Sequence, residues 1–191
     1  MKIFERYEPD GLFATLVPDR PTQKLGHQSV SWLETHSDFA AIVIVGIGLI
    51  ARLKAASGTF LNPDEALHFF IANRSSRALA YQASLTTAHP PLLIFVLYWW
   101  RHLGTSELML RLPSVIAGVA FCWIFFQWVR RTFDNTIALI GVILVALLPP
   151  MVALSAQVRQ YALMLLFLIS ALYLVERGFA EGSWWRILAS S

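Results

Sequence analysis

Three long runs without a charged residue constrain this chain more than any other feature. Asp, Glu, Lys and Arg are absent from Leu112–Val129, from Asn135–Val158 and from Gln160–Val175. A helix needs about 20 mainly apolar residues to cross a bilayer, so each run predicts a membrane-spanning helix. The composition agrees, because 14% of the residues are charged and soluble domains carry roughly 25%. We therefore expect an all-α membrane protein rather than a large soluble helical protein.

A fourth span is expected earlier in the chain, where Phe39–Ala51 is apolar and is followed by Arg52 and Lys54. Long basic side chains near a helix end extend to the membrane interface, so both cations are compatible with a span there. The predicted organisation is a cytoplasmic tail and a transmembrane module, with these residue ranges: tail 1–37, module 38–191, spans at about 38–57, 110–129, 135–154 and 159–176, and an external loop at about 58–109.

The uncharged segment between Arg77 and Arg101 resembles a further span, but its apolar half is only Pro90–Trp100. A run that short favours helices lying parallel to the membrane in the external loop. With four spans, the two arginines of the tight connection 130–135 fall in the cytoplasm, as the positive-inside rule requires. The same parity places residues 58–109 and Pro149–Arg159 on the external face of a cell membrane.

The remaining composition excludes several classes of function. The net charge of +3 does not suggest nucleic-acid binding, and a single cysteine, Cys122, allows no intramolecular disulfide. Asp64, Glu65, His68 and His89 could supply metal ligands, but their spacing fits no standard metal site. No cofactor is expected, and the sequence leaves a divalent metal open.

The stretch Asn62-Pro63-Asp64-Glu65 follows the first expected span. Asn is a favoured helix N-cap, Pro is favoured at the first helical position, and Glu65 stands at the third position as in a capping box. Asp64 is less well explained by capping, and it shares a helical face with His68, four residues on. A carboxylate beside an imidazole at the bilayer edge is a candidate general base.

Three more positions at the expected external face are candidates for ligand binding. His89 lies in Ala88-His89-Pro90-Pro91, which is either a helix start or a rigid turn that directs the histidine to a ligand. Arg111 and Arg159 lie where helices begin, and cations are disfavoured there by about 0.3–1 kcal/mol. Interfacial arginines and an anion site, such as one for phosphate, remain the alternatives.

The order of four motifs resembles one family of membrane enzymes. The motifs are the Asp64-Glu65 pair, His89-Pro90-Pro91-Leu92, the stretch Gly104–Gly118 that contains Arg111-Leu112-Pro113-Ser114, and Ser155-x-x-x-Arg159-x-Tyr161. Together they are similar to the N-terminal half of polyprenyl-phosphate-dependent glycosyltransferases of the GT-C fold. These include protein O-mannosyltransferases, aminoarabinose transferases that act on lipid A, and rhizobial galacturonosyltransferases.

The resemblance implies inverting transfer of a sugar from a polyprenyl-phosphate carrier to a hydroxyl of a glycan, lipid or protein acceptor at the external membrane face. It implies Asp64 as general base with Glu65 as its catalytic partner. It also implies that His89 and Arg159 lie near the donor phosphate, with Tyr161 in the same motif. An acid common in the family two residues before Arg159 is Gln157 here.

The family has roughly twice as many spans as we expect here, so the C-terminal half of the family fold is expected to be absent and the chain alone inactive. The alternative to an enzyme is a non-catalytic membrane subunit that keeps the fold and binds a lipid or a protein partner. A transporter is disfavoured because the charges gather at the span ends rather than near the bilayer midplane.

Overall fold

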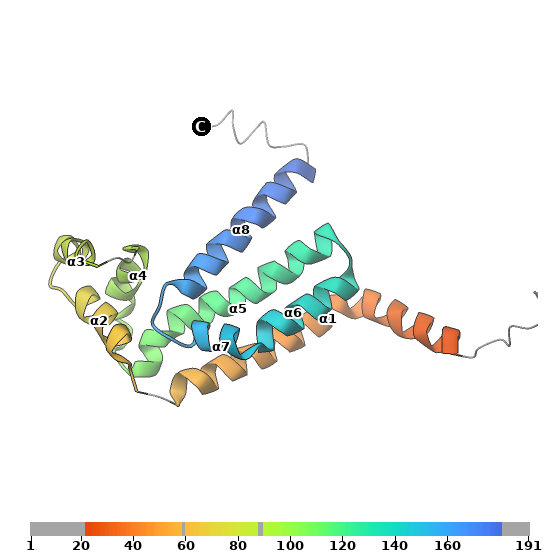
Figure 1. Cartoon of the computed structure of the whole chain (residues 1–191), viewed down its shortest axis with the longest axis horizontal. Coiled ribbons are helices and arrows are strands. Elements are labelled where there is room, and N and C mark those ends of the chain that lie inside the picture. The colour runs from red at the N-terminus through yellow and green to blue at the C-terminus, as the bar shows by residue number, and fades with distance from the viewer. Residues whose placement is uncertain (1–21, 59, 88–89, 181–191) are drawn as a thin grey trace, which may run out of the picture.

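The computed structural model describes residues 22–58, 60–87 and 90–180, and every regular element within these ranges is an α-helix (Figure 1). Three helical segments are long and apolar enough to cross a membrane: His36–Ser57, Glu107–Thr132 and Tyr161–Phe179. A fourth crossing is available if the pair Asn135–Leu147 and Pro149–Ser155, bent by 59°, forms one broken span. The prediction of an all-α membrane protein is confirmed.

The first helix, α1 (Thr22–Ser57), starts inside the segment predicted as a cytoplasmic tail. Its backbone is not helical at His36, where φ is −115° and ψ is 17°, so a break separates an N-terminal helical segment from the apolar part. Residues 1–21 of the predicted tail lie outside the described residues. In Figure 1 the N-terminal part of α1 extends beyond the bundle.

The membrane bundle consists of α1, α5 (Glu107–Thr132), α6 (Asn135–Leu147) and α8 (Tyr161–Ala180). Figure 1 shows α1, α5 and α6 side by side, and α8 packs on α5. The buried face of α6 includes Ala138 and Ala146, and small side chains allow helices to approach closely in a membrane. The buried core of the bundle comprises Ala41, Phe121, Cys122, Phe126, Val129, Ala138, Leu139, Val142, Ala146 and Ile169.

The expected span 135–154 is not one straight helix. It divides into α6 and the short α7 (Pro149–Ser155), and the two axes differ by 59°. Pro149 and Pro150 have no amide hydrogen and their rings crowd the preceding turn, which breaks a helix. The two prolines are therefore the physical cause of the bend.

Arg52 does not extend to the membrane interface, which corrects the expectation from the sequence. Only 1% of the residue is exposed, and the guanidinium lies inside the bundle. Its hydrogen-bond acceptors include backbone carbonyls of α6. Lys54, two residues further on, is exposed as expected.

Three short helices gather at one end of the bundle: α2 (Pro63–Ala72), α3 (Arg77–Ser84) and α4 (Leu92–Trp100) (Figure 1). The nine residues of α4 rise about 14 Å, which is too short to cross a bilayer core of about 30 Å. These helices share a small core with the start of α5, formed by Ile71, Ala72, Ala80, Leu93, Ile94, Leu97, Tyr98, Leu110 and Val158.

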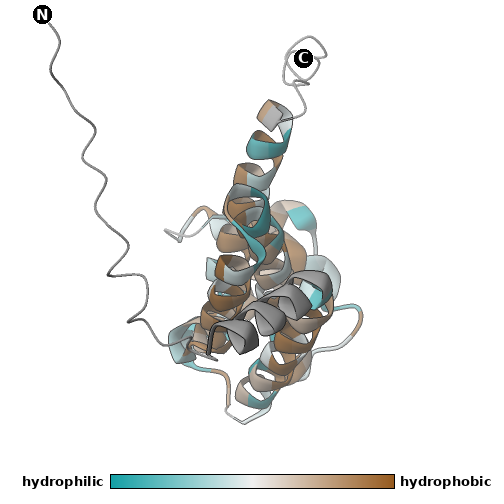
Figure 2. Ribbon diagram, turned by 90° about the vertical axis from the view of Figure 1, so that its right-hand side faces the viewer, coloured by the Kyte–Doolittle hydropathy of each residue, from teal (hydrophilic) through white to brown (hydrophobic). Residues whose placement is uncertain are grey.

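Ion pairs join the helices at the opposite end of the bundle. Arg131 of α5 donates to Glu176 of α8 at 2.9 Å, and Arg130 pairs with Asp38 of α1. Figure 2 shows predominantly hydrophobic ribbons along the bundle, with hydrophilic colour near helix ends and in connections. The two ends of the bundle therefore differ, because one carries the short helices α2–α4 and the other carries ion pairs between the long helices.

Candidate functional site

The start of α2 forms a complete capping box. The Asn62 side chain accepts from the Glu65 amide at 2.9 Å, and the Glu65 carboxylate accepts from the Asn62 amide at 3.0 Å. Pro63 occupies the first turn, where its missing N–H costs nothing. The cap predicted from the sequence is confirmed, and it fixes the direction in which the next residues of α2 point.

Glu65 also forms a buried ion pair with Arg111 of α5. The Arg111 Nε and Nη2 atoms donate to the two carboxylate oxygens at 3.0 and 2.8 Å, and each residue is 1% exposed. Arg111 further donates to the carbonyls of Ala56 at 2.7 Å and Phe60 at 3.0 Å. The amide of Val158 donates to Glu65 at 2.8 Å. One buried cluster thus joins the end of α1, α2, α5 and the segment before α8.

This placement changes the interpretation of two predicted site residues. The sequence suggested Glu65 as a catalytic partner and Arg111 as an anion-binding group, but each is buried and bonded to the other. Burial raises the pKa of the Glu65 carboxyl, and hydrogen bonds from Arg111, Asn62 and Val158 together with the charge of Arg111 outweigh it, so the net pKa is below its ordinary value. We therefore interpret Glu65 and Arg111 as structural groups, ionised and inaccessible to a substrate in this structure.

Asp64 and Arg159, by contrast, meet at the surface. The Arg159 Nη2 atom donates to the Asp64 carboxylate, whose side chain is 65% exposed, whereas that of Arg159 is 24% exposed. The Arg159 guanidinium lies 6.0 Å from the ring centre of Tyr161. Its Nε atom is buried without a hydrogen-bond partner among the described residues. The structure thus brings together Asp64, Arg159 and Tyr161, although Asp64 is distant from the other two in sequence.

The segment that carries Arg159 is held by its backbone. Val158 donates to Glu65, and the Ser114 hydroxyl of α5 donates to the Arg159 carbonyl at 3.3 Å. No motif in the sequence predicted these supports, although the buried Ser114 lies three residues after Arg111 on the same face of α5. The exposed pair of Asp64 and Arg159 therefore stands on a buried polar framework.

His68 does not belong to this surface pair. His68 is 3% exposed and lies on the buried face of α2 with Glu65, whereas Asp64 is exposed. The expectation that Asp64 and His68 share one accessible face of α2 is therefore wrong. His89 lies outside the described residues, and its expected place near the donor phosphate stays a prediction.

An apolar groove of about 420 Å³ lies between the start of α4 and the first turns of α8. It begins at Gln160, the residue next to Arg159, and follows one face of α8. The lining is apolar except for Gln160, and consists of Pro90, Leu92, Leu93, Gln160, Leu163, Met164, Phe167 and Leu168. The charged pair thus stands at one end of a surface that suits a hydrocarbon chain.

No group of three or more His, Cys, Asp or Glu side chains that could hold a metal ion occurs within residues 22–58, 60–87 and 90–180. Asp64 and Glu65 do not converge on one point, because one is exposed and the other is buried against Arg111. Among the described residues, Asp64, Arg159 and Tyr161 offer a carboxylate, a guanidinium and a phenol at this surface.

Comparison with known proteins places the chain in a family. The family model described as dolichyl-phosphate-mannose-protein mannosyltransferase matches residues 88–191, which is more than half of the chain. The match includes Arg111, Arg159 and Tyr161, whereas Asp64 lies before it. No curated protein and no solved structure shows significant similarity to the chain.

Proposed function

Because the chain belongs to the dolichyl-phosphate-mannose-protein mannosyltransferase family, we propose that it transfers a sugar from a polyprenyl-phosphate carrier to an acceptor hydroxyl. The family is one of membrane glycosyltransferases of the GT-C type. The observation that carries the proposal is the contact between Asp64 and Arg159 beside an apolar groove. That arrangement offers a base, a phosphate-binding cation and a lipid-binding surface within one site.

Arg159 is proposed to bind the donor phosphate. A guanidinium presents a planar set of N–H donors that matches phosphate oxygens, and the buried Nε of Arg159 has no hydrogen-bond partner among the described residues. The groove that starts at Gln160 would receive the first isoprene units of the carrier. The Tyr161 ring lies 6.0 Å from the guanidinium, at the outer limit of a cation–π contact.

Asp64 is proposed as the general base. In the free protein its carboxylate pairs with Arg159. A bound donor phosphate would compete for the guanidinium and leave the exposed carboxylate available to the acceptor. General-base catalysis requires a group within hydrogen-bond reach of the proton it removes, and the 65% exposure of the Asp64 side chain leaves it accessible to an acceptor hydroxyl.

The proposed sugar transfer is a single displacement at the anomeric carbon. Asp64 takes the proton of the acceptor hydroxyl while the hydroxyl oxygen forms a bond to the anomeric carbon of the sugar. The bond between that carbon and the phosphate oxygen breaks, and polyprenyl phosphate leaves with the electron pair. Arg159 stabilises the charge that develops on the leaving phosphate. Attack on the face opposite the leaving group gives inversion at the anomeric carbon.

We propose the external face of a cell membrane as the location of this chemistry. Asp64 and Arg159 lie at the end of the bundle that carries α2–α4, and Arg130 and Arg131 lie at the other end. The positive-inside rule puts the end with Arg130 and Arg131 in the cytoplasm. The acceptor, whether glycan, lipid or protein, would then approach Asp64 from outside.

Asp64→Asn tests the proposal, because it removes the base and keeps the size of the side chain. In a full-length homologous context, with membranes supplied with a radiolabelled polyprenyl-phosphate sugar, we expect sugar transfer to fall by at least about 100-fold, with unchanged expression and insertion. Glu107→Gln, which changes a partly exposed carboxyl group at the same end of the bundle, is the matched control and should transfer normally. Normal transfer by Asp64→Asn would refute the general-base assignment.

A further inference from the structure

The double proline between α6 and α7 removes two hydrogen-bond donors from the helix interior. In an α-helix the amide of residue i donates to the carbonyl of residue i−4, so Pro149 and Pro150 leave the carbonyls of Val145 and Ala146 without their helical donors. Unpaired carbonyl groups are especially costly inside a membrane protein, because lipid offers no replacement donor. Both carbonyls therefore need a donor from elsewhere.

Arg52 of α1 supplies a donor to each carbonyl, and the Cys122 thiol adds a longer contact of 3.7 Å to the Val145 carbonyl. Its Nη1 atom donates to the Ala146 carbonyl at 2.7 Å, and its Nη2 atom donates to the Val145 carbonyl at 3.1 Å. The other N–H groups of the same guanidinium donate to the Gly48 carbonyl, to the Ser155 hydroxyl at 3.0 Å and to the Cys122 sulfur at 3.5 Å. A cation is also favourable at the C-terminal end of α6, where the helix dipole is negative.

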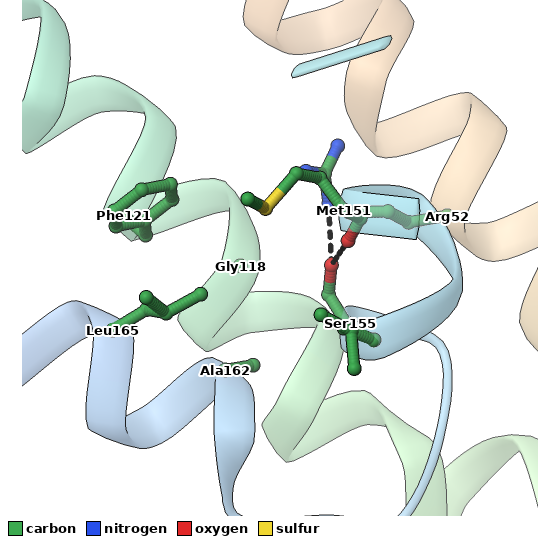
Figure 3. A pocket seen from close by; sticks show the side chains of 8 residues that line it. Arg52, Gly118, Phe121, Met151, Ser155, Ala162 and Leu165 are labelled. Atoms are coloured by element: carbon green, nitrogen blue, oxygen red, sulfur yellow. Dashed lines mark hydrogen bonds between the residues drawn. The ribbon is translucent and has the colours of Figure 1, made fainter. Parts of the chain in front are cut away.

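Ser155 connects this guanidinium to the end of α7. Figure 3 shows Arg52 and Ser155 joined by a hydrogen bond, with the Ser155 hydroxyl also bonded to the Met151 carbonyl one turn earlier in α7. Gly118 of α5 permits this approach, because a Cβ atom there would lie 2.5 Å from the Ser155 Cβ. The same guanidinium thus bonds to both sides of the bend.

The chain uses the same device a second time. Pro113 in α5 leaves the carbonyl of Met109 without its helical donor, and the Trp100 Nε1 atom of α4 donates to that carbonyl at 2.8 Å. In both places a side chain from another helix replaces an amide that proline lacks. The contact of Arg52 with Val145 and Ala146 therefore compensates for the two amides that the prolines lack.

We propose that Arg52 is a positioning residue for the site: it holds the bend between α6 and α7 and, through Ser155, fixes the segment Ala156–Gln160 that carries Arg159. The second half of this proposal rests on the proposed function. Arg52 has no hydrogen bond to Asp64 or Arg159, and it acts through the Ser155 hydroxyl and the carbonyls of Val145 and Ala146. Its loss would displace the Arg159 guanidinium relative to Asp64 and the groove.

The bend itself is tested by spin-label distances in lipid nanodiscs. Labels at Ile140 in α6 and Ala153 in α7, both exposed, span the bend in a Cys122→Ala background, which also removes the thiol that donates to the Val145 carbonyl. Arg52→Met removes every N–H donor and keeps an unbranched chain. We expect it to broaden the Ile140–Ala153 distance distribution and to leave a control pair at Ile47 and Ile116 unchanged. An unchanged distribution across the bend would overturn the proposal.

A second distance measurement restores the amides that the prolines lack. In Arg52→Met combined with Pro149→Ala and Pro150→Ala, the two carbonyls regain helical donors, so we expect one narrow distribution at a longer distance. This arm also decides the case in which Arg52→Met alone fails to fold. If the triple variant fails to fold as well, the donors are not what Arg52 supplies and the proposal is overturned.

The effect of Arg52 on the position of Arg159 is tested by equilibrium binding of polyprenyl phosphate. Arg52→Met should raise its Kd by roughly tenfold or more, and should raise it no further in an Arg159→Ala background. An equal effect in both backgrounds would show that Arg52 does not act through Arg159. Absence of polyprenyl-phosphate binding by the unmodified chain would instead refute the proposed function and leave the distance measurements standing.

Discussion

The substitution Glu65→Gln tests the buried framework beneath the site. Four donors converge on the carboxylate: Arg111 Nε at 3.0 Å, Arg111 Nη2 at 2.8 Å, the Asn62 amide at 3.0 Å and the Val158 amide at 2.8 Å. Glutamine replaces one acceptor oxygen by an NH₂ group, which faces these donors, and leaves a buried guanidinium without its counter-charge. Removing one partner of a buried ion pair costs about 3–5 kcal/mol.

At about 2–4 °C of Tm for each kcal/mol in a chain of this size, the loss corresponds to roughly 6–20 °C. Thermal unfolding of the purified protein in detergent, followed by tryptophan fluorescence, measures it. Glu176→Gln is the matched control, because it breaks an Arg–Glu pair whose side chains are 34% and 26% exposed. Such surface pairs contribute about 0–1 kcal/mol. Equal Tm shifts for the two variants would refute the assignment of Glu65 to a buried structural pair.

Two further predictions use the same unfolding assay. The folded-state pKa of Glu65 is below its ordinary value. The ionised carboxylate therefore stabilises the fold above the unfolded pKa of about 4.3, and this stabilisation is lost as the pH falls through the folded value. The stability difference between the unmodified chain and Glu65→Gln should shrink on acidification below about pH 4–5, and a constant difference would contradict this. Gly118→Ala should destabilise the fold by about 1–3 kcal/mol, because the added Cβ would lie 2.5 Å from the Ser155 Cβ. Gly46→Ala is the control and should not destabilise it, because no atom lies within 4 Å of the added Cβ. Equal stability of the two alanine variants would refute the close packing at Gly118.

The membrane class could be predicted from the sequence, because an uncharged run long enough to cross a bilayer is rare in soluble domains. The cap at Asn62 could be predicted as well, since capping depends on a few adjacent residues. The proximity of Asp64 and Arg159 was anticipated only as a shared external face. Their direct contact depends on how the segment before α8 folds back toward α2, and no local pattern encodes that.

The buried charged contacts could not be predicted from the sequence, as three residues show: Arg52, Glu65 and Arg111. A charged residue near a helix end has the same local pattern whether it extends to the interface or pairs in the interior. The deciding factor is a distant partner: the carbonyls of Val145 and Ala146 for Arg52, and Arg111 for Glu65. The one available signal for Arg52 was the double proline, which requires two donors from outside its own helix.

We propose that Arg159, supported by the buried framework, binds the phosphate of a lipid carrier beside Asp64. Equilibrium binding of polyprenyl phosphate and of the uncharged polyprenol to the chain in nanodiscs measures the contribution of this phosphate contact. We expect the phosphate to bind more tightly than the alcohol, and Arg159→Ala to raise the Kd of the phosphate alone by roughly 10–100-fold. The exposed Arg74 provides the control, and Arg74→Ala should bind normally. Equal affinity for the two lipids, or undiminished phosphate binding by Arg159→Ala, would contradict the claim.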